Sequence, residues 1–152
     1  MLFSPEREDG SALQIRSASV PTVDIFSGII AECTRLPTLI KAGKAAQFGQ
    51  MLKAGAWTDA ALSVIALELP AWKVRRLIFE DGEWVCSLSS QQNLPAELDD
   101  TADAHHECLP LAILSAFLKA RRRVVASRDN YSTIVPKIRA AAENPICCDN
   151  FA

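Results

Sequence analysis

The sequence has the length and composition of one ordinary globular domain: 152 residues, of which 49% are hydrophobic and 22% are charged. A chain of this length buries roughly 68–70% of its unfolded surface, so its core needs neither disulfides nor a metal. The formal net charge of −2, from 16 Lys and Arg against 18 Asp and Glu, argues against a dedicated nucleic-acid-binding protein, which is usually strongly basic.

The N-terminal residues carry a proline and several acids where a secretory signal needs basic and then apolar residues. The longest nearly apolar run, 109–118, has ten residues, whereas a membrane-spanning helix needs about 18 or more. We therefore expect no membrane contact and a cytoplasmic location.

The cysteines predict free thiols in a reducing compartment. Their number is odd, and no C-x-x-C pair is present to bind zinc or act as a redox pair. Three of them are expected to be small buried hydrophobes: Cys33, Cys86 and Cys108. Cys147 and Cys148 are adjacent, which is a poor geometry for a disulfide, and we expect them to be exposed and thiol-reactive.

Composition divides the chain into a loose N-terminal arm over 1–21, a single α+β domain over 22–143 and a C-terminal tail over 144–152. Within the arm, apolar and polar residues alternate over 12–17, which allows a short strand. Neither terminal segment shows a strong periodic pattern.

The first half of the domain is predicted to be helical. Apolar residues repeat at spacings of three and four over 22–54, with an interruption at Pro37. Gly55 is expected to end this region in the left-handed conformation. A further, largely apolar helix follows, with Thr58 as its N-cap and Pro70 at its end.

The clearest local signal is a β-hairpin over 72–90. Two segments rich in β-forming residues flank Asp81-Gly82, a pair that accepts the positive φ angles of a two-residue type I′ turn. The register that follows pairs Phe79 with Trp84 and Leu77 with Cys86 on one side of the ribbon, and Ile78 with Val85 on the other. Because both sides are apolar, we expect the hairpin to pack against helices and to pair with 12–17 or with another chain.

The last strong element is predicted as a helix over 97–123. Apolar residues recur there at about 100° per residue and form a stripe that includes His105, which is therefore expected in the core. Pro110 removes a helical hydrogen bond, so we expect a kink or a break at that residue. A short helix is expected over 133–143.

The most suggestive chemical cluster lies on the 97–109 part of this predicted helix. Asp99, Asp103 and His106 fall on one helical face, and with Glu107 they offer the carboxylates and imidazole that bind a divalent metal or support metal-dependent hydrolysis. The competing interpretation is structural, because acids near the start of a helix and bases near its end suit the helix dipole. No recognised metal-binding motif is present.

Arg121, Arg122 and Arg123 form the single basic run of the sequence. Such a run can contact the phosphates of a nucleic acid or an acidic partner. No phosphate-binding loop or set of stacking aromatic residues accompanies it, so the competing interpretation is a solvated helix end that caps exposed carbonyls. Nucleic-acid binding is therefore not the favoured function.

The favoured hypothesis is a small interaction or regulatory protein without catalytic activity and without a cofactor. Its fold class is α+β, with four or five helices packed around an antiparallel β-hairpin or three-stranded sheet. The positive mean hydropathy of +0.11 and the three tryptophans indicate more apolar surface than one small monomer hides, which usually marks a protein–protein contact. Phe79 and Trp84 are the candidate binding residues, and a homo-oligomer or another protein partner is expected. The alternatives are the Asp/His metal site and binding through the arginine run.

Overall fold

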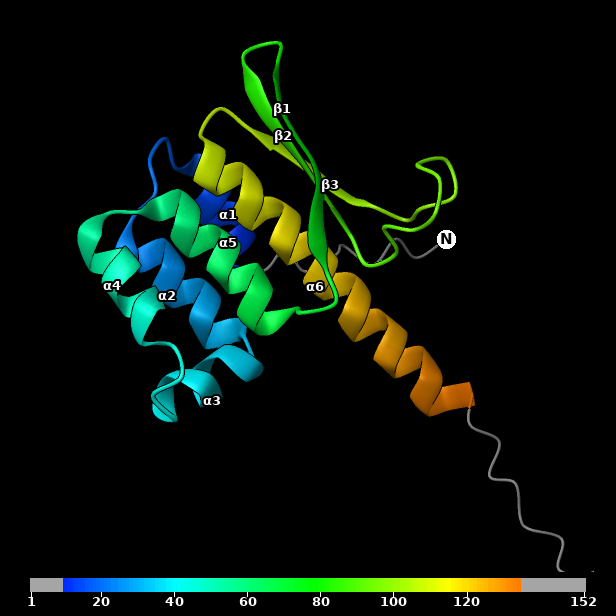
Figure 1. Ribbon diagram of the computed structural model, residues 1–152, viewed down its shortest axis with the longest axis horizontal. Coiled ribbons are helices and arrows are strands. Elements are labelled where there is room, and N and C mark those ends of the chain that lie inside the picture. Colours follow the sequence, from blue (N-terminus) through cyan, green and yellow to red (C-terminus); the bar gives the residue numbers. More distant parts are fainter. Residues whose placement is uncertain (1–9, 135–152) are drawn as a thin grey trace, which may run out of the picture.

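The structure, a computed structural model, describes residues 10–134, the last four by their backbone alone. This part of the chain forms six helices and a three-stranded antiparallel sheet, which confirms the predicted α+β class (Figure 1). The helices are α1 (Gly10–Ser17), α2 (Val23–Glu32), α3 (Arg35–Lys41), α4 (Ala46–Ala54), α5 (Trp57–Glu68) and α6 (Leu109–Ile134). The strands are β1 (Lys73–Glu80), β2 (Glu83–Ser89) and β3 (Ala102–His106), and they lie side by side in that order. None of the described helices is long and apolar enough to cross a membrane.

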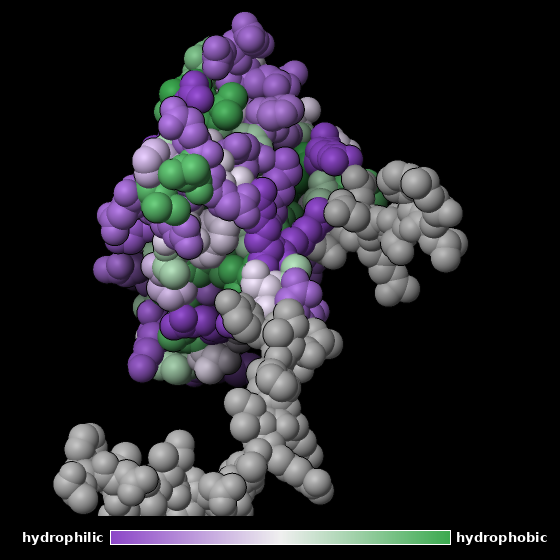
Figure 2. All heavy atoms as spheres, turned by 90° about the vertical axis from the view of Figure 1, so that its right-hand side faces the viewer, coloured by the Kyte–Doolittle hydropathy of each residue, from purple (hydrophilic) through white to green (hydrophobic). Residues whose placement is uncertain are grey.

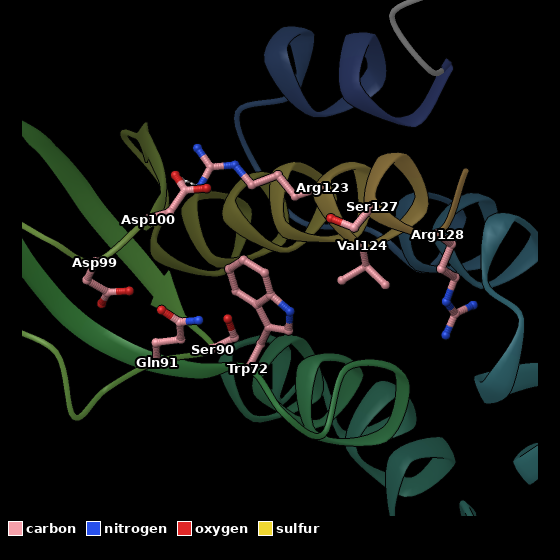
Figure 3. Close-up of a pocket in the computed structure, with 9 residues that line it drawn as sticks. All are labelled: Trp72, Ser90, Gln91, Asp99, Asp100, Arg123, Val124, Ser127 and Arg128. Carbon is pink, nitrogen blue, oxygen red and sulfur yellow. Dashed lines mark hydrogen bonds and ion pairs between the residues drawn. The ribbon is translucent and has the colours of Figure 1, made fainter. Parts of the chain in front are cut away.

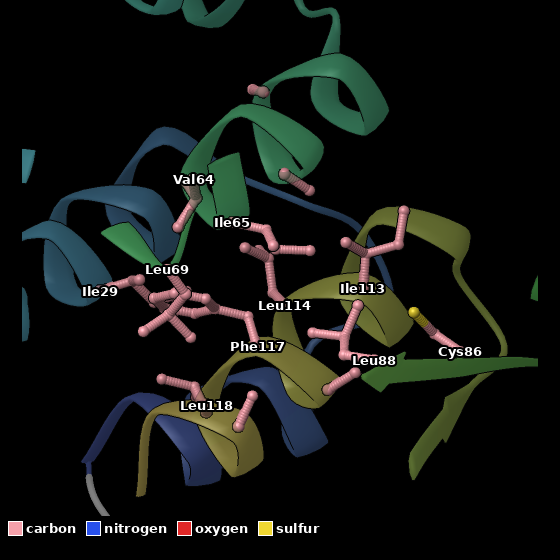
Figure 4. Close-up of a cluster of buried hydrophobic side chains, with 14 of the residues drawn as sticks. Ile29, Val64, Ile65, Leu69, Cys86, Leu88, Ile113, Leu114, Phe117 and Leu118 are labelled. Atoms are coloured by element: carbon pink, nitrogen blue, oxygen red, sulfur yellow. The ribbon is translucent and has the colours of Figure 1, made fainter. Parts of the chain in front are cut away.

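The helices gather on one face of the sheet, and α6 is the helix that joins the two layers (Figure 1). It packs against β2 and β3, and also against α1 and α5. Alternating strand residues form the sheet side of the core, namely Cys86, Leu88, Ala102 and Ala104. The α6 side includes Leu114 and Phe117, which belong to the buried cluster shown in Figure 4. One core therefore holds the sheet and the helices together.

Residues 10–17 form a helix within the expected N-terminal arm, so the prediction of a strand over 12–17 is wrong. Ser11 and Ile15, one helical turn apart, are the buried residues of α1, whereas Leu13 is exposed. The Ser11 hydroxyl also donates a 2.6 Å hydrogen bond to Oε1 of Glu32 on α2. These contacts with distant residues select the helical spacing over the alternation visible in the sequence.

The helical region over 22–54 breaks at two places, and neither is Pro37. The first break follows α2 at Cys33 and Thr34, and the second lies between α3 and α4, where Gly43 has a φ of +71°. Pro37 is the third residue of α3, a position in the first helical turn where a missing N–H costs no helical hydrogen bond.

The predicted ends of the neighbouring helices have mixed outcomes. Gly55 ends α4 with a φ of 70° in the left-handed region, which confirms the prediction. Thr58 is not the N-cap of the next helix, because α5 begins at Trp57 and Ala56 takes the cap position without a side-chain hydrogen bond. Leu69 follows the last residue of α5, and Pro70 comes directly after it, as expected for a helix stop.

The helix predicted over 97–123 is wrong in its first half. Residues 102–106 form β3, paired with β2, and α6 begins only at Leu109. Pro110 is the second residue of α6, so it marks the start of a helix and not a kink within one. His105 points away from the core with a side chain that is 68% exposed. Most of the helix predicted over 133–143, and the two C-terminal cysteines, lie outside the described residues.

Candidate functional site

The β1–β2 hairpin has the turn and the register that the sequence predicts. Asp81 and Gly82 have φ angles of 53° and 84°, as a type I′ turn requires. The pairs are Phe79 with Trp84, Leu77 with Cys86, and Ile78 with Val85. These observations confirm the predicted turn and the three predicted pairs.

Gly82→Ala is expected to lower the free energy of unfolding by about 1 kcal/mol, because a Cβ strains backbone with a φ of +84°. No atom lies within 4 Å of the position a Cβ would take, so the cost is one of backbone conformation and not of a clash. Asp81→Asn is the control, since asparagine also tolerates the left-handed region. Urea unfolding of wild type and both variants measures their free energies of unfolding. Equal stability of Gly82→Ala and wild type would contradict the prediction.

Phe79 and Trp84 form an aromatic pair on the hairpin, with ring centroids 5.3 Å apart and planes tilted by 56°. Such a pair stabilises a ribbon by about 0.5–1.5 kcal/mol. Trp84 is half-buried, but Phe79 remains 59% exposed. The turn end of the hairpin extends beyond the helices in Figure 1, and hydrophobic atoms reach the surface among hydrophilic ones at that end of the molecule in Figure 2. This pair is the part of the predicted binding set that the structure brings together.

The opposite face of the hairpin combines apolar and charged side chains. Ile78 and Val85 are half-buried and lie opposite each other. Arg76 and Glu80 flank Ile78 on β1, with Nη2 and Oε2 separated by 4.0 Å. This face therefore carries one positive and one negative side chain, Arg76 and Glu80, along the edge strand β1.

The two edges of the sheet differ in what covers their backbone groups. At the β3 edge, Lys119 Nζ donates to the carbonyl of Asp103 (2.7 Å), and Arg123 Nη1 donates to the carbonyl of Thr101 (2.6 Å). At the β1 edge, no other described segment forms a backbone hydrogen bond with 76–80. The β1 edge is thus available for pairing, and unpaired edges are where sheets add strands.

The predicted Asp/His metal set does not share one face, because its segment is loop and strand instead of helix. Asp99 pairs with Arg75, whose Nη2 also donates to the carbonyl of Leu94 (2.8 Å). The Asp103 carboxylate accepts a 3.1 Å hydrogen bond from the Thr101 hydroxyl. Within the described residues, no group of three or more His, Cys, Asp and Glu side chains is placed to hold a metal.

His106 uses both of its ring nitrogens, and Glu107 beside it is exposed. The backbone N–H of Cys108 donates to Nδ1 at 2.9 Å, so Nδ1 carries no proton. Nε2 then holds the proton and donates it to the carbonyl of Ile15 at 3.2 Å. Through these two hydrogen bonds His106 links α1 to the start of α6.

The arginine run lies in the middle of α6, so the prediction of a solvated helix end is wrong. Arg121 donates to the backbone carbonyl of Glu32, and its Nη1 lies 3.7 Å from Oε2 of that residue. Arg123 donates to Oδ1 of Asp100 at 2.8 Å, besides its bond to the β3 edge. Arg122 is half-buried. Arg121 and Arg123 thus tie α6 to α2 and to the loop before β3.

Two of the predicted buried cysteines are in the core, and Cys108 is half-buried. Burial, together with the Glu68 carboxylate, raises the pKa of Cys33 to about 12. Burial and the nearby Asp103 raise the pKa of Cys86 to about 12 as well. Both thiols stay protonated at neutral pH, and a protonated thiol is a poor nucleophile.

A hollow of about 380 Å³ lies between the start of β1, the loop before β3 and the far half of α6 (Figure 3). Trp72 and Ser127 line it, and the charges of Arg123 and Asp100 at its wall are paired with each other. Its two carboxylates, Asp99 and Asp100, are each paired with an arginine, Arg75 and Arg123 respectively. No pattern in the sequence marks this hollow, because its walls come from segments far apart in the chain.

The chain was compared with protein-family models, curated proteins and solved structures. None of them matches.

Proposed function

We propose that the chain is an interaction protein without catalytic activity that self-associates through the apolar surface of its hairpin. The observation that carries the proposal is Phe79, an aromatic residue 59% exposed on a ribbon end that extends beyond the helices. Leu77 and Trp84 adjoin it on the same side of the ribbon and are only half-buried. An apolar patch rimmed by charged residues is typical of protein–protein contacts.

The remaining chemistry of the described residues supports a role in binding and not in catalysis. The two core thiols are held protonated by burial, and both nitrogens of His106 are engaged in hydrogen bonds. We further propose a reducing, cytoplasmic setting, because Cys33, Cys86 and Cys108 are free thiols.

Phe79→Ser is expected to weaken self-association about tenfold or more, because the ring would be buried by the partner. Sedimentation equilibrium over a wide range of protein concentration measures the dissociation constant of the wild-type and variant oligomers. Leu98→Ser is the matched control, since Leu98 is 71% exposed but lies in the loop before β3. A monomeric wild type, or an oligomer that Phe79→Ser leaves unchanged, would reject the proposal.

A further inference from the structure

Hairpin geometry determines which backbone groups of β1 point outward. The residues that flank a two-residue turn, here Glu80 and Glu83, exchange hydrogen bonds with each other, and bonded and non-bonded pairs alternate from there. Ile78 and Arg76 therefore bond to β2, whereas Leu77 and Phe79 direct their N–H and C=O groups outward. A strand added at this edge must place its own outward-directed residues opposite these two.

A second copy of β1 meets this condition in antiparallel, two-fold registers centred on Leu77, Ile78 or Phe79. In the register centred on Leu77, Arg76 lies opposite Ile78 of the second copy. In the register centred on Phe79, Ile78 lies opposite Glu80 of the second copy. Centred on Ile78, each Arg76 faces the partner's Glu80, and each Leu77 faces the partner's Phe79. Only this register joins opposite charges on one face and apolar side chains on the other.

We propose that two copies of the chain associate through antiparallel pairing of their β1 strands, with Ile78 on the two-fold axis and Arg76 opposite the partner's Glu80. This inference rests on the proposed self-association and specifies its partner and register. Arg76 and Glu80 are 60% and 61% exposed and lie 4.0 Å apart within one strand, so both ions are available at the edge. The pairing joins the two sheets into one of six strands and covers Phe79.

The interface is short, because it uses five residues of each strand. Small interfaces of this kind belong to weak or transient complexes. We therefore expect a dissociation constant in the micromolar range, in which changes of charge at the interface have measurable effects.

Arg76→Glu and Glu80→Arg test the register because the two-fold axis doubles each change. Either variant alone places like charges opposite each other twice, so we expect the dimer dissociation constant to rise about tenfold or more. An equal mixture of the two variants restores opposite charges at both places, so a heterodimer should form. Native mass spectrometry identifies the heterodimer by its mass, which differs from the mass of each homodimer.

Lys53→Glu provides the control for Arg76→Glu, since it makes the same change of charge on an exposed part of α4 and should leave the dimer intact. Loss of dimer in both hairpin variants with recovery in the mixture supports the proposal. Loss without recovery, or no loss at all, overturns this register, while the proposed function stands as long as Phe79→Ser still removes the oligomer. A monomeric wild type overturns both.

Discussion

Glu68→Ala is expected to lower the free energy of unfolding by about 3 kcal/mol, one of the two largest effects of any substitution proposed for this chain. Glu68 is the last residue of α5 and only 5% exposed. Its carboxylate accepts hydrogen bonds from the backbone N–H groups of Thr34 (2.9 Å), Arg35 (2.9 Å) and Leu36 (2.8 Å), and from the Thr34 hydroxyl (3.0 Å). The side chain thus caps the start of α3 from another helix, and alanine leaves these donors without their acceptor.

The contribution of Glu68 also depends on pH. Burial raises the pKa of Glu68, but the hydrogen bonds from 34–36 lower it by more, so the pKa lies below its ordinary value of 4.5. A lowered folded-state pKa means that the stabilisation is complete above the unfolded pKa and is lost as pH falls through the folded one. The stability difference between wild type and Glu68→Gln should therefore narrow below about pH 4.5.

Urea unfolding at a series of pH values measures both effects. Glu97→Gln is the matched control, because Glu97 is exposed in the loop before β3 and its replacement should change stability by less than about 0.5 kcal/mol. A Glu68→Ala variant as stable as the control would show that water replaces the carboxylate at α3 without cost.

Phe117→Ala is expected to destabilise the protein by about 3–5 kcal/mol, because it removes a fully buried ring and leaves a cavity. Phe117 lies on α6, the helix that packs against both the sheet and the other helices. It belongs to the same buried cluster as Ile29, Leu69 and Leu114 (Figure 4). A cavity at this position weakens both layers at once.

Two further variants of α6 serve as comparisons for the loss of stability in Phe117→Ala. Phe117→Leu fills part of the cavity and should cost less than half as much as alanine. Val125→Ala removes apolar atoms from an exposed position of the same helix and should change stability by less than about 0.5 kcal/mol. Equal effects of Phe117→Ala and Val125→Ala in urea unfolding would contradict the central place of this ring.

The hairpin could be predicted in detail because its information is local. Asp81-Gly82 sets the turn, and the turn sets the pairing from Glu80 and Glu83 back to Arg76 and Ser87, beyond which the register shifts. Phe79 and Trp84 could be recognised as surface candidates for the same reason. The open edge of β1 could not be predicted, because it depends on where β3 pairs and on what α6 covers.

The segment 97–109 was predicted incorrectly because two periodicities overlap there. Ala102 and Ala104 are buried and Asp103 and His105 are exposed, which is the period of a strand. On a helix, however, Ala102 falls on one stripe with Leu98, His105 and Leu109. Pairing with β2, which is distant in the sequence, decides between them. The capping of α3 by Glu68 and the anchoring of Arg121 on α2 are non-local in the same way, and no pattern in the sequence marks either contact.

The side-chain hydrogen bonds at the β3 edge affect how many copies of the chain the sheet can add. A sheet with two open edges can add copies without limit, and this is how proteins with free strands form fibres. Here Lys119 and Arg123 donate to the carbonyls of Asp103 and Thr101, which disfavours a further strand on that side. The proposed pairing of two β1 strands uses the open edge of each copy, so we expect assembly to stop at a closed pair.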